Sequence, residues 1–104
     1  MTTKITLYIG LNDKDTKFQI FSEIEAFKIV TNLLTVSGIT GATVYDAKGI
    51  FTHECNALII ENTIRVELFD PDEQAVLKAV SAIKNALNQE SIGYSKEIIE
   101  VKFI

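Results

Sequence analysis

The longest regular pattern in this chain is the alternation of residue types from Ala57 to Phe69. Side chains alternate between the two faces of a β-strand, so the pattern predicts a long central strand with one buried face. The set expected to face the core is Leu58, Ile60, Ile64, Val66 and Leu68, and the opposite set is Ile59, Glu61, Thr63, Arg65 and Glu67. The apolar set requires a cover, and the polar set is left for solvent, a ligand or another subunit.

Two other segments have the spacing of amphipathic helices. Ser22 and Glu25 are spaced as a capping box, which predicts a helix from about Ser22 to Thr35. Asp70, Pro71 and Glu73 predict the N-cap, first position and acidic first turn of a second helix. The apolar faces are expected to consist of Ile24, Phe27, Val30, Leu33 and Leu34 in the first helix, and of Val76, Val80, Ile83 and Leu87 in the second.

Shorter extended segments complete the pattern. Lys4–Gly10 and 41–47 alternate as strands, and 46–56 is expected to form a hairpin with the central strand. After the second helix, 92–95 and 98–103 read as two extended pieces separated by two charged residues. The resulting βαββαβ order predicts an α+β, ferredoxin-like domain over residues 1–104, with both helices on one face of an antiparallel sheet and a C-terminal piece available as an extra edge strand.

Composition limits the partners that such a domain can bind. The 104 residues are 47% apolar and 23% charged, as in a globular domain, and they carry a formal charge of −4 with only ten Lys and Arg. This balance argues against direct binding to nucleic acid, which requires a basic surface. No long apolar run predicts a membrane span, and the single cysteine, Cys55, agrees with a reducing compartment. We therefore expect a cytoplasmic protein.

The sheet face without helices is expected to carry the function. It would hold Tyr8, Tyr45 and Ile59 together with the charged residues of the central strand. Glu61, Arg65 and Glu67 predict a ladder of ion pairs. Because no other segment is predicted to cover this face, we expect a second copy of the chain to pack on it, with Arg65 meeting a glutamate of its neighbour.

Several short motifs resemble a known group of sequences. They are Gly10-Leu11-Asn12, Thr43-Val44-Tyr45-Asp46-Ala47 followed by Gly49, then Glu54, and Asn88-Gln89-Glu90-Ser91. Together they are similar to a family of small uncharacterised proteins from bacteriophages and Firmicutes prophages, a domain family of unknown function. The resemblance implies a ferredoxin-like fold and a phage or prophage setting, and hence the cytoplasm of a bacterial host cell.

No residue pattern predicts catalysis or metal binding. His53 and Glu54 are adjacent, so on a strand they would point apart, and one histidine with one cysteine does not make a zinc site. The loop 12–16 lacks the glycine and the distal glutamate of a calcium loop. The residues expected to bind a ligand or partner are Tyr8, Asn12, Lys14, Tyr45, His53, Glu61, Arg65 and Glu67.

Three classes of function remain open. The first is a non-enzymatic, homo-oligomeric interaction protein of phage type that binds a host protein and antagonises a host defence system. The second is a protein that binds or sequesters a small ligand, a nucleotide or another anion, through Arg65, Lys14 and Tyr8. The third, which the isolated position of each reactive group disfavours, is an acid/base enzyme using Glu61, Glu67 or His53. No cofactor is expected in any of them.

Overall fold

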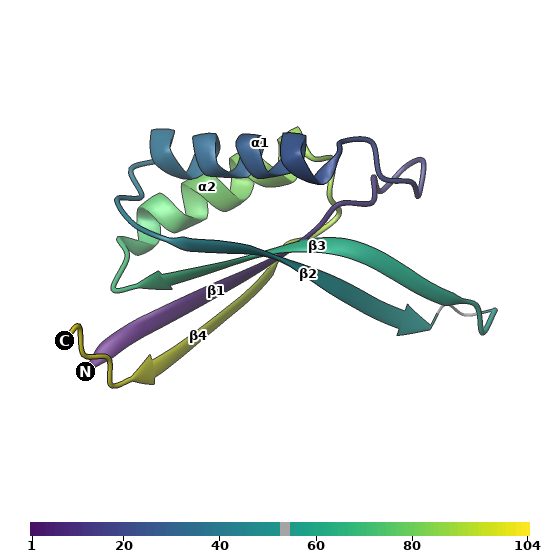
Figure 1. The fold of residues 1–104 in the computed structure, drawn as a ribbon. Coiled ribbons are helices and arrows are strands. Elements are labelled where there is room, and N and C mark those ends of the chain that lie inside the picture. Colours follow the sequence, from purple (N-terminus) through teal and green to yellow (C-terminus); the bar gives the residue numbers. More distant parts are fainter. Residues whose placement is uncertain (53–54) are drawn as a thin grey trace.

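The computed structural model describes residues 1–52 and 55–104. Its elements are β1 (Thr2–Gly10), α1 (Glu23–Val36), β2 (Thr43–Thr52), β3 (Leu58–Phe69), α2 (Glu73–Ala86) and β4 (Gly93–Ile99). The strands form one antiparallel sheet in the order β2-β3-β1-β4, and both helices lie on the same face of it (Figure 1). The predicted ferredoxin-like fold is confirmed.

The core lies between the helices and the two central strands. Leu7 of β1 pairs with Val66 of β3, so the apolar sets of the two strands point to the same side. The helices supply Val30 and Ile83 to the same fully buried cluster. Because Tyr8 pairs with Arg65, the alternate residues of both strands lie together on the opposite face, which we call the open face.

The first turn of α1 follows the sequence pattern, but its buried side is different. The capping box of Ser22 and Glu25 is present. The buried residues are Ala26, Val30 and Leu34, which are four residues apart, whereas the predicted Ile24 and Phe27 are 70% and 43% exposed. At ~100° per residue, Ile24 lies about 120° around the helix from Val30, outside the stripe that faces the sheet.

The predicted start of α2 is wrong by two residues. Asp72 is the N-cap, and its carboxylate accepts a hydrogen bond from the Gln74 N–H at 3.0 Å. Asp70 has a positive φ of 47° and instead accepts a hydrogen bond from the Thr3 N–H at 2.8 Å, which fastens the end of β3 to β1. Pro71 therefore precedes the cap. The helix buries Ala75, Val76, Ala79 and Ile83, while the predicted Val80 is only partly buried.

Replacing Asp72 with alanine should lower the free energy of unfolding by about 0.5–2 kcal/mol, because the cap of α2 is lost. Asp72→Asn should retain most of the stability, since an asparagine side chain can accept the same hydrogen bond. Gln74→Ala is the matched control, because it keeps the backbone N–H that is capped. Urea denaturation of the three variants measures the effect, and equal stability of Asp72→Ala and wild type would contradict the assignment of the cap.

β2 extends further than the strand predicted over 41–47. β2 continues to Thr52, which pairs with Leu58, and this end of the hairpin extends beyond the helices (Figure 1). We call residues 48–52 and 58–62 the hairpin arm. Leu58 and Ile60 were expected in the core but are 63% and 61% exposed. A strand of 12 residues spans ~40 Å and a helix of 14 residues only ~21 Å, so the helices do not reach them.

The turn beyond the arm contains a residue in a left-handed conformation, Asn56, with φ of 63°. Asparagine adopts this conformation more readily than most residues, so it takes the place of the glycine common in such turns. The predicted binding residue His53 and its neighbour Glu54 lie outside the described residues.

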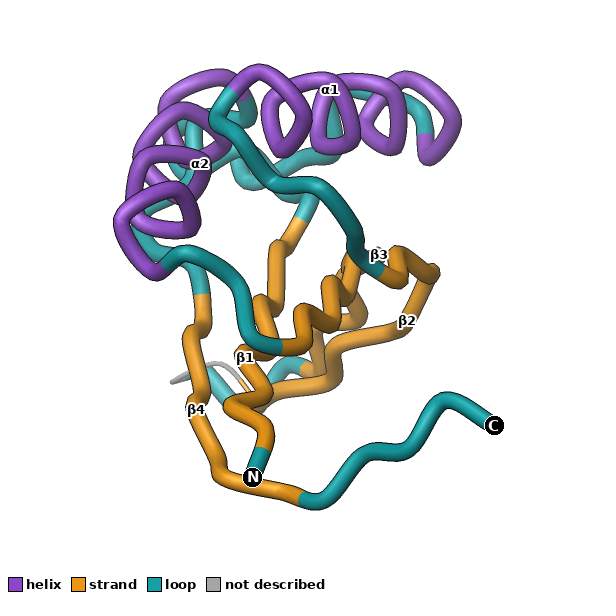
Figure 2. Tube along the Cα trace, turned by 90° about the vertical axis from the view of Figure 1, so that its left-hand side faces the viewer, coloured by secondary structure: helices purple, strands orange, loops and turns teal. Residues whose placement is uncertain are grey.

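The C-terminal part differs from the two extended pieces predicted. β4 is one continuous strand in which Lys96 and Glu97 pair with β1. Residues 100–104 form no strand, so the extra edge strand is wrong. The tail turns back from the end of β4 (Figure 2), and the ring of Phe103 packs edge-on against Phe69, with 6.3 Å between centroids. A short contact between tail and sheet therefore replaces an added strand.

Candidate functional site

A cavity of about 980 Å³ lies on the open face, and its lining includes the end of β1, the start of β4 and part of the hairpin arm. Three glycines in this lining lie against side chains of neighbouring strands. A Cβ atom on Gly10 would lie 2.6 Å from the Glu61 carboxylate, and one on Gly93 would lie 3.1 Å from the Tyr8 side chain. Gly49 leaves a third gap beside Thr63. The missing side chains thus make room for Glu61, Tyr8 and Thr63.

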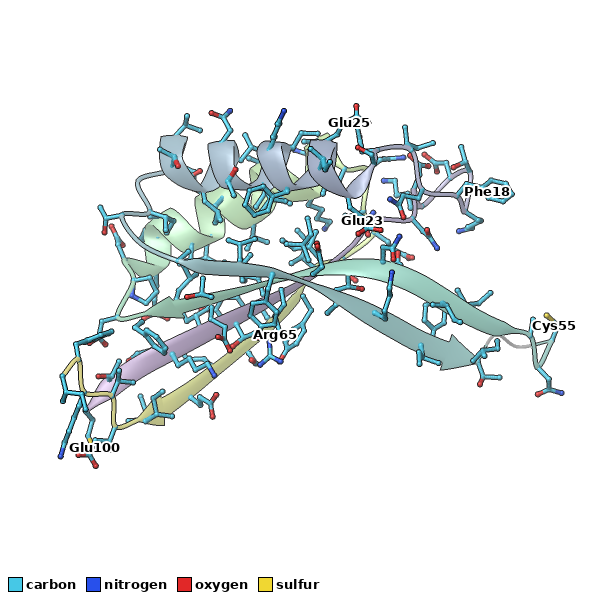
Figure 3. All side chains as sticks on the ribbon, in the orientation of Figure 1. Phe18, Glu23, Glu25, Cys55, Arg65 and Glu100 are labelled. Atoms are coloured by element: carbon cyan, nitrogen blue, oxygen red, sulfur yellow. The ribbon has the colours of Figure 1, made fainter. Side chains whose placement is uncertain are left out.

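Arg65 lies between two tyrosine rings. Tyr8 on β1 and Tyr45 on β2 both pair with Arg65 on β3, so the three side chains form one row across the sheet. The guanidinium carbon lies 5.3 Å from the ring centroid of Tyr8 and 5.6 Å from that of Tyr45, within the range of cation–π contacts. Figure 3 shows Arg65 on the side of the sheet away from the helices.

The guanidinium has more hydrogen-bond donors than partners. One terminal nitrogen of Arg65 donates to Glu67 at 3.4 Å, a long contact. Within the described residues, its buried Nε has no hydrogen-bond partner. A guanidinium carries five N–H donors, and the Arg65 side chain is still 33% exposed. The rings therefore hold in place a cation that can donate to a further acceptor.

Glu67 belongs to an ion-pair network in which Lys4 is its nearest cation, at 3.2 Å. The hydrogen bond from Lys4 holds the pKa of Glu67 below its usual value, and the Tyr45 hydroxyl and the charge of Arg65 act in the same direction. Shielding from water raises the pKa of Tyr45, so its phenol stays protonated. Glu67 is thus a structural anion, and the sequence analysis missed its partner Lys4, which lies on the same face two residues before Thr6.

Glu61 does not join the predicted ion-pair ladder. It lies four residues from Arg65 along β3, or about 13 Å. Its Oε2 accepts a hydrogen bond from the Asn12 N–H at 2.8 Å, and its carboxylate covers Gly10. The predicted binding residues Asn12 and Glu61 are therefore in contact, at the end of β1.

Two loops are tied together at the rim of the cavity. The side-chain amide of Asn88 donates to Asp13 at 2.9 Å and to Asp15 at 2.8 Å. The amide of Gln89, which is buried, donates to the backbone carbonyl of Asn12 at 2.8 Å. The backbone N–H of Thr16 and the amide of Asn88 hold the pKa of Asp13 below its usual value. These bonds position Lys14, which lines the cavity.

The structure thus distributes the predicted residues over two places. Tyr8, Tyr45, Arg65 and Glu67 lie together on the open face, where Tyr8 and Arg65 line the cavity. Asn12, Lys14 and Glu61 line the same cavity near the end of β1. Gln89, Gly93 and Phe51, which line the same cavity, were not predicted as site residues. The motif Asn88-Gln89-Glu90-Ser91 was the available signal for the first of these.

In residues 1–52 and 55–104, no group of three or more His, Cys, Asp or Glu side chains could hold a metal ion. No helix among those residues is long and apolar enough to cross a membrane.

Several solved structures have a similar fold. Among solved structures, a phage SAM lyase in complex with S-methyl-5'-thioadenosine is 18% identical, with a TM-score of 0.69, and the match covers 92% of this chain and 80% of that one. CutA from Archaeoglobus fulgidus, a periplasmic divalent cation tolerance protein, is 14% identical with a TM-score of 0.61, and the match covers 99% and 88%. The GlnK–ATP complex of B. subtilis is 14% identical with a TM-score of 0.53, and the match covers 92% and 81%.

The family comparison covers almost the whole chain. No curated protein matches the sequence. The profile of a family described as a protein of unknown function, DUF3574, matches residues 4–103. The expected membership of a domain family of unknown function is confirmed: the chain belongs to the DUF3574 family.

Proposed function

We propose that this protein binds a small ligand with a phosphate group in the cavity on the open face. The observation that carries the proposal is Arg65, which is stacked between Tyr8 and Tyr45 and has donors left over. Guanidinium groups bind carboxylate and phosphate through paired hydrogen bonds. The two rings hold the cation in position before a ligand arrives, so little side-chain entropy is lost on binding.

A purely structural role of Arg65, as the ion-pair partner of Glu67, explains its contacts less well than a role in ligand binding does. Glu67 already has Lys4 at 3.2 Å, so its longer contact with Arg65 is not needed to neutralise it. A part-shielded guanidinium with unfilled donors is costly unless another group compensates it. An oxyanion in the cavity would supply acceptors for the exposed terminal N–H groups of Arg65.

Two solved structures of the same fold contain a ligand with an adenosine group, and in one of them that ligand also carries phosphate. The phage SAM lyase structure contains S-methyl-5'-thioadenosine, and the GlnK structure contains ATP. Both ligands are adenosine derivatives, and a nucleotide is one of the ligands predicted from the sequence. The first of these neighbours also supports the predicted phage setting.

Thermal denaturation with added ligands tests the proposal. ATP, AMP and ribose 5-phosphate are the charged probes, and adenosine is the uncharged control. A ligand at about a hundred times its dissociation constant adds about 2.7 kcal/mol, a rise in melting temperature on the order of 10 °C for a domain of this size. We expect at least one charged probe to produce such a rise and Arg65→Met to reduce it.

The matched control is Lys78→Met, which removes one positive charge from the exposed surface of α2. Circular dichroism of both variants without ligand checks that they remain folded. If no charged probe raises the melting temperature, or if Arg65→Met and Lys78→Met respond alike, the proposal is wrong.

Self-association is a second candidate property, and the hairpin arm favours it. Ile50 pairs with Ile60, so Ile50, Leu58 and Ile60 lie on one side of the arm, beyond the helices. They are 68%, 63% and 61% exposed, an apolar patch of the kind that marks protein interfaces. We infer that a second copy covers this arm, in place of the open face expected from the sequence. Antagonism of a host defence system remains a prediction.

A further inference from the structure

One end of the cavity is apolar, and an anion held at Arg65 would not contact it. Ala47, Phe51, Ala57 and Ile59 line it where the open face continues onto the hairpin arm. Phe51 pairs with Ile59, and its side chain is 49% exposed. Gly49, two residues earlier on the same face, has no side chain to fill the space between Ala47 and Phe51. A flat group could therefore lie over Gly49 against the ring of Phe51.

The spacing between this end and Arg65 sets the length of the ligand. Gly49 pairs with Glu61, which is four residues before Arg65 on β3, so the two places are about 13 Å apart along the strand. An inorganic anion or a small carboxylic acid cannot reach both. A cavity of about 980 Å³ also lies at the upper end of the range for small-molecule sites, about 300–1,000 Å³.

A hydrogen-bond acceptor lies beside Gly49, because Gly49 pairs with Glu61. Glu61 uses its Oε2 to accept from Asn12. Its Oε1 accepts no hydrogen bond from any residue in 1–52 or 55–104, and Glu61 lines the cavity. A carboxylate oxygen accepts from hydroxyl or amino groups and repels phosphate. This part of the cavity therefore suits the sugar of a nucleotide and disfavours its phosphate.

We infer that the ligand is a nucleoside phosphate with its base against Phe51 over Gly49, a sugar hydroxyl on Glu61 and the phosphate on Arg65. The inference rests on the proposed function, because it uses the same anion contact at Arg65. It adds the aromatic base as a second, independent determinant of affinity. Stacking of a base on an aromatic side chain commonly accounts for about tenfold or more in affinity.

Calorimetric titration of probes that differ only in the base tests this inference. The probes are the 5'-monophosphates of adenosine, guanosine, cytidine and uridine, and ribose 5-phosphate, which lacks a base. We expect at least one nucleotide to bind wild type about tenfold or more tightly than ribose 5-phosphate does. Phe51→Ala should remove this difference and leave the affinity for ribose 5-phosphate unchanged. Phe69→Ala, a similar substitution of an exposed ring outside the cavity lining, is the matched control.

The two proposals fail in different ways. If ribose 5-phosphate binds as tightly as every nucleotide, and binding is lost in Arg65→Met, the anion site stands and the base site is wrong. The same conclusion follows if Phe51→Ala leaves the preference for a nucleotide intact. If none of the five probes binds wild type, both the nucleotide assignment and the proposed function are wrong.

Discussion

Replacing Val76 with aspartate is expected to unfold the domain at 25 °C. Val76 is fully buried in the middle of the α2 face that packs on β1 and β3. A carboxylate there would lose its hydration without gaining a partner, and burying an unpaired charge costs far more than the ~4 kcal/mol of a buried neutral polar group. Domains of this size are stable by only about 5–15 kcal/mol in total. Circular dichroism should show loss of helix signal and of the cooperative thermal transition.

The same substitution at two other positions on α2 gives stabilities with which Val76→Asp can be compared. Val80 is only partly buried, so Val80→Asp should destabilise less, because the carboxylate can reach water. Leu77 is 52% exposed, and Leu77→Asp should be close to wild type. The expected order of stability is Leu77→Asp, then Val80→Asp, then Val76→Asp. Any other order would mean that a different side of α2 packs against the sheet.

Replacing Ile60 with glutamate is expected to change the mass of the protein in solution. Wild type should form a homo-oligomer at micromolar concentration, with a mass that is a multiple of 11.6 kDa. A glutamate in the middle of the patch of Ile50, Leu58 and Ile60 would be desolvated in the interface, so Ile60→Glu should have a mass near 11.6 kDa. Size-exclusion chromatography with light scattering measures both masses.

Leu77→Glu is the matched control for this experiment, since it introduces the same charge at an exposed apolar residue on α2. It should leave the mass of the oligomer unchanged. If wild type itself has a mass near 11.6 kDa well above micromolar concentration, the hairpin arm is not an interface between copies of this chain.

The sequence was sufficient for the order of elements because each one carries a local signal. The alternation in β3, the capping box of Ser22 and the acidic start of α2 are all contained within a few residues. The limits of the core were not predicted, because the reach of a helix over a strand depends on their packing. Ile60 and Ile64 have the same pattern in the sequence, and only the end of the helices distinguishes the exposed one from the buried one.

The candidate site was predictable in its residue types and not in its contacts. Tyr8, Tyr45 and Arg65 were all assigned to the open face, but their stacking follows from a register that joins three separate strands. A shift of two residues would have kept every side chain on its face and separated the row. The cavity beside it is lined by residues of all four strands, whose alignment the sequence does not contain.

The position of β1 in the sheet has a consequence for the synthesis of the protein. β1 is made first but lies between β3 and β4, and Thr2 pairs with Ile99 near the other end of the chain. The ribosome adds about 5–20 residues per second, so β1 is synthesised several seconds before its second neighbour in the sheet, β4. During that time the apolar side of β1, with Ile5, Leu7 and Ile9, has no complete core to enter. Delayed folding of this kind exposes a nascent chain to chaperones and to aggregation for a time that becomes longer as synthesis becomes slower.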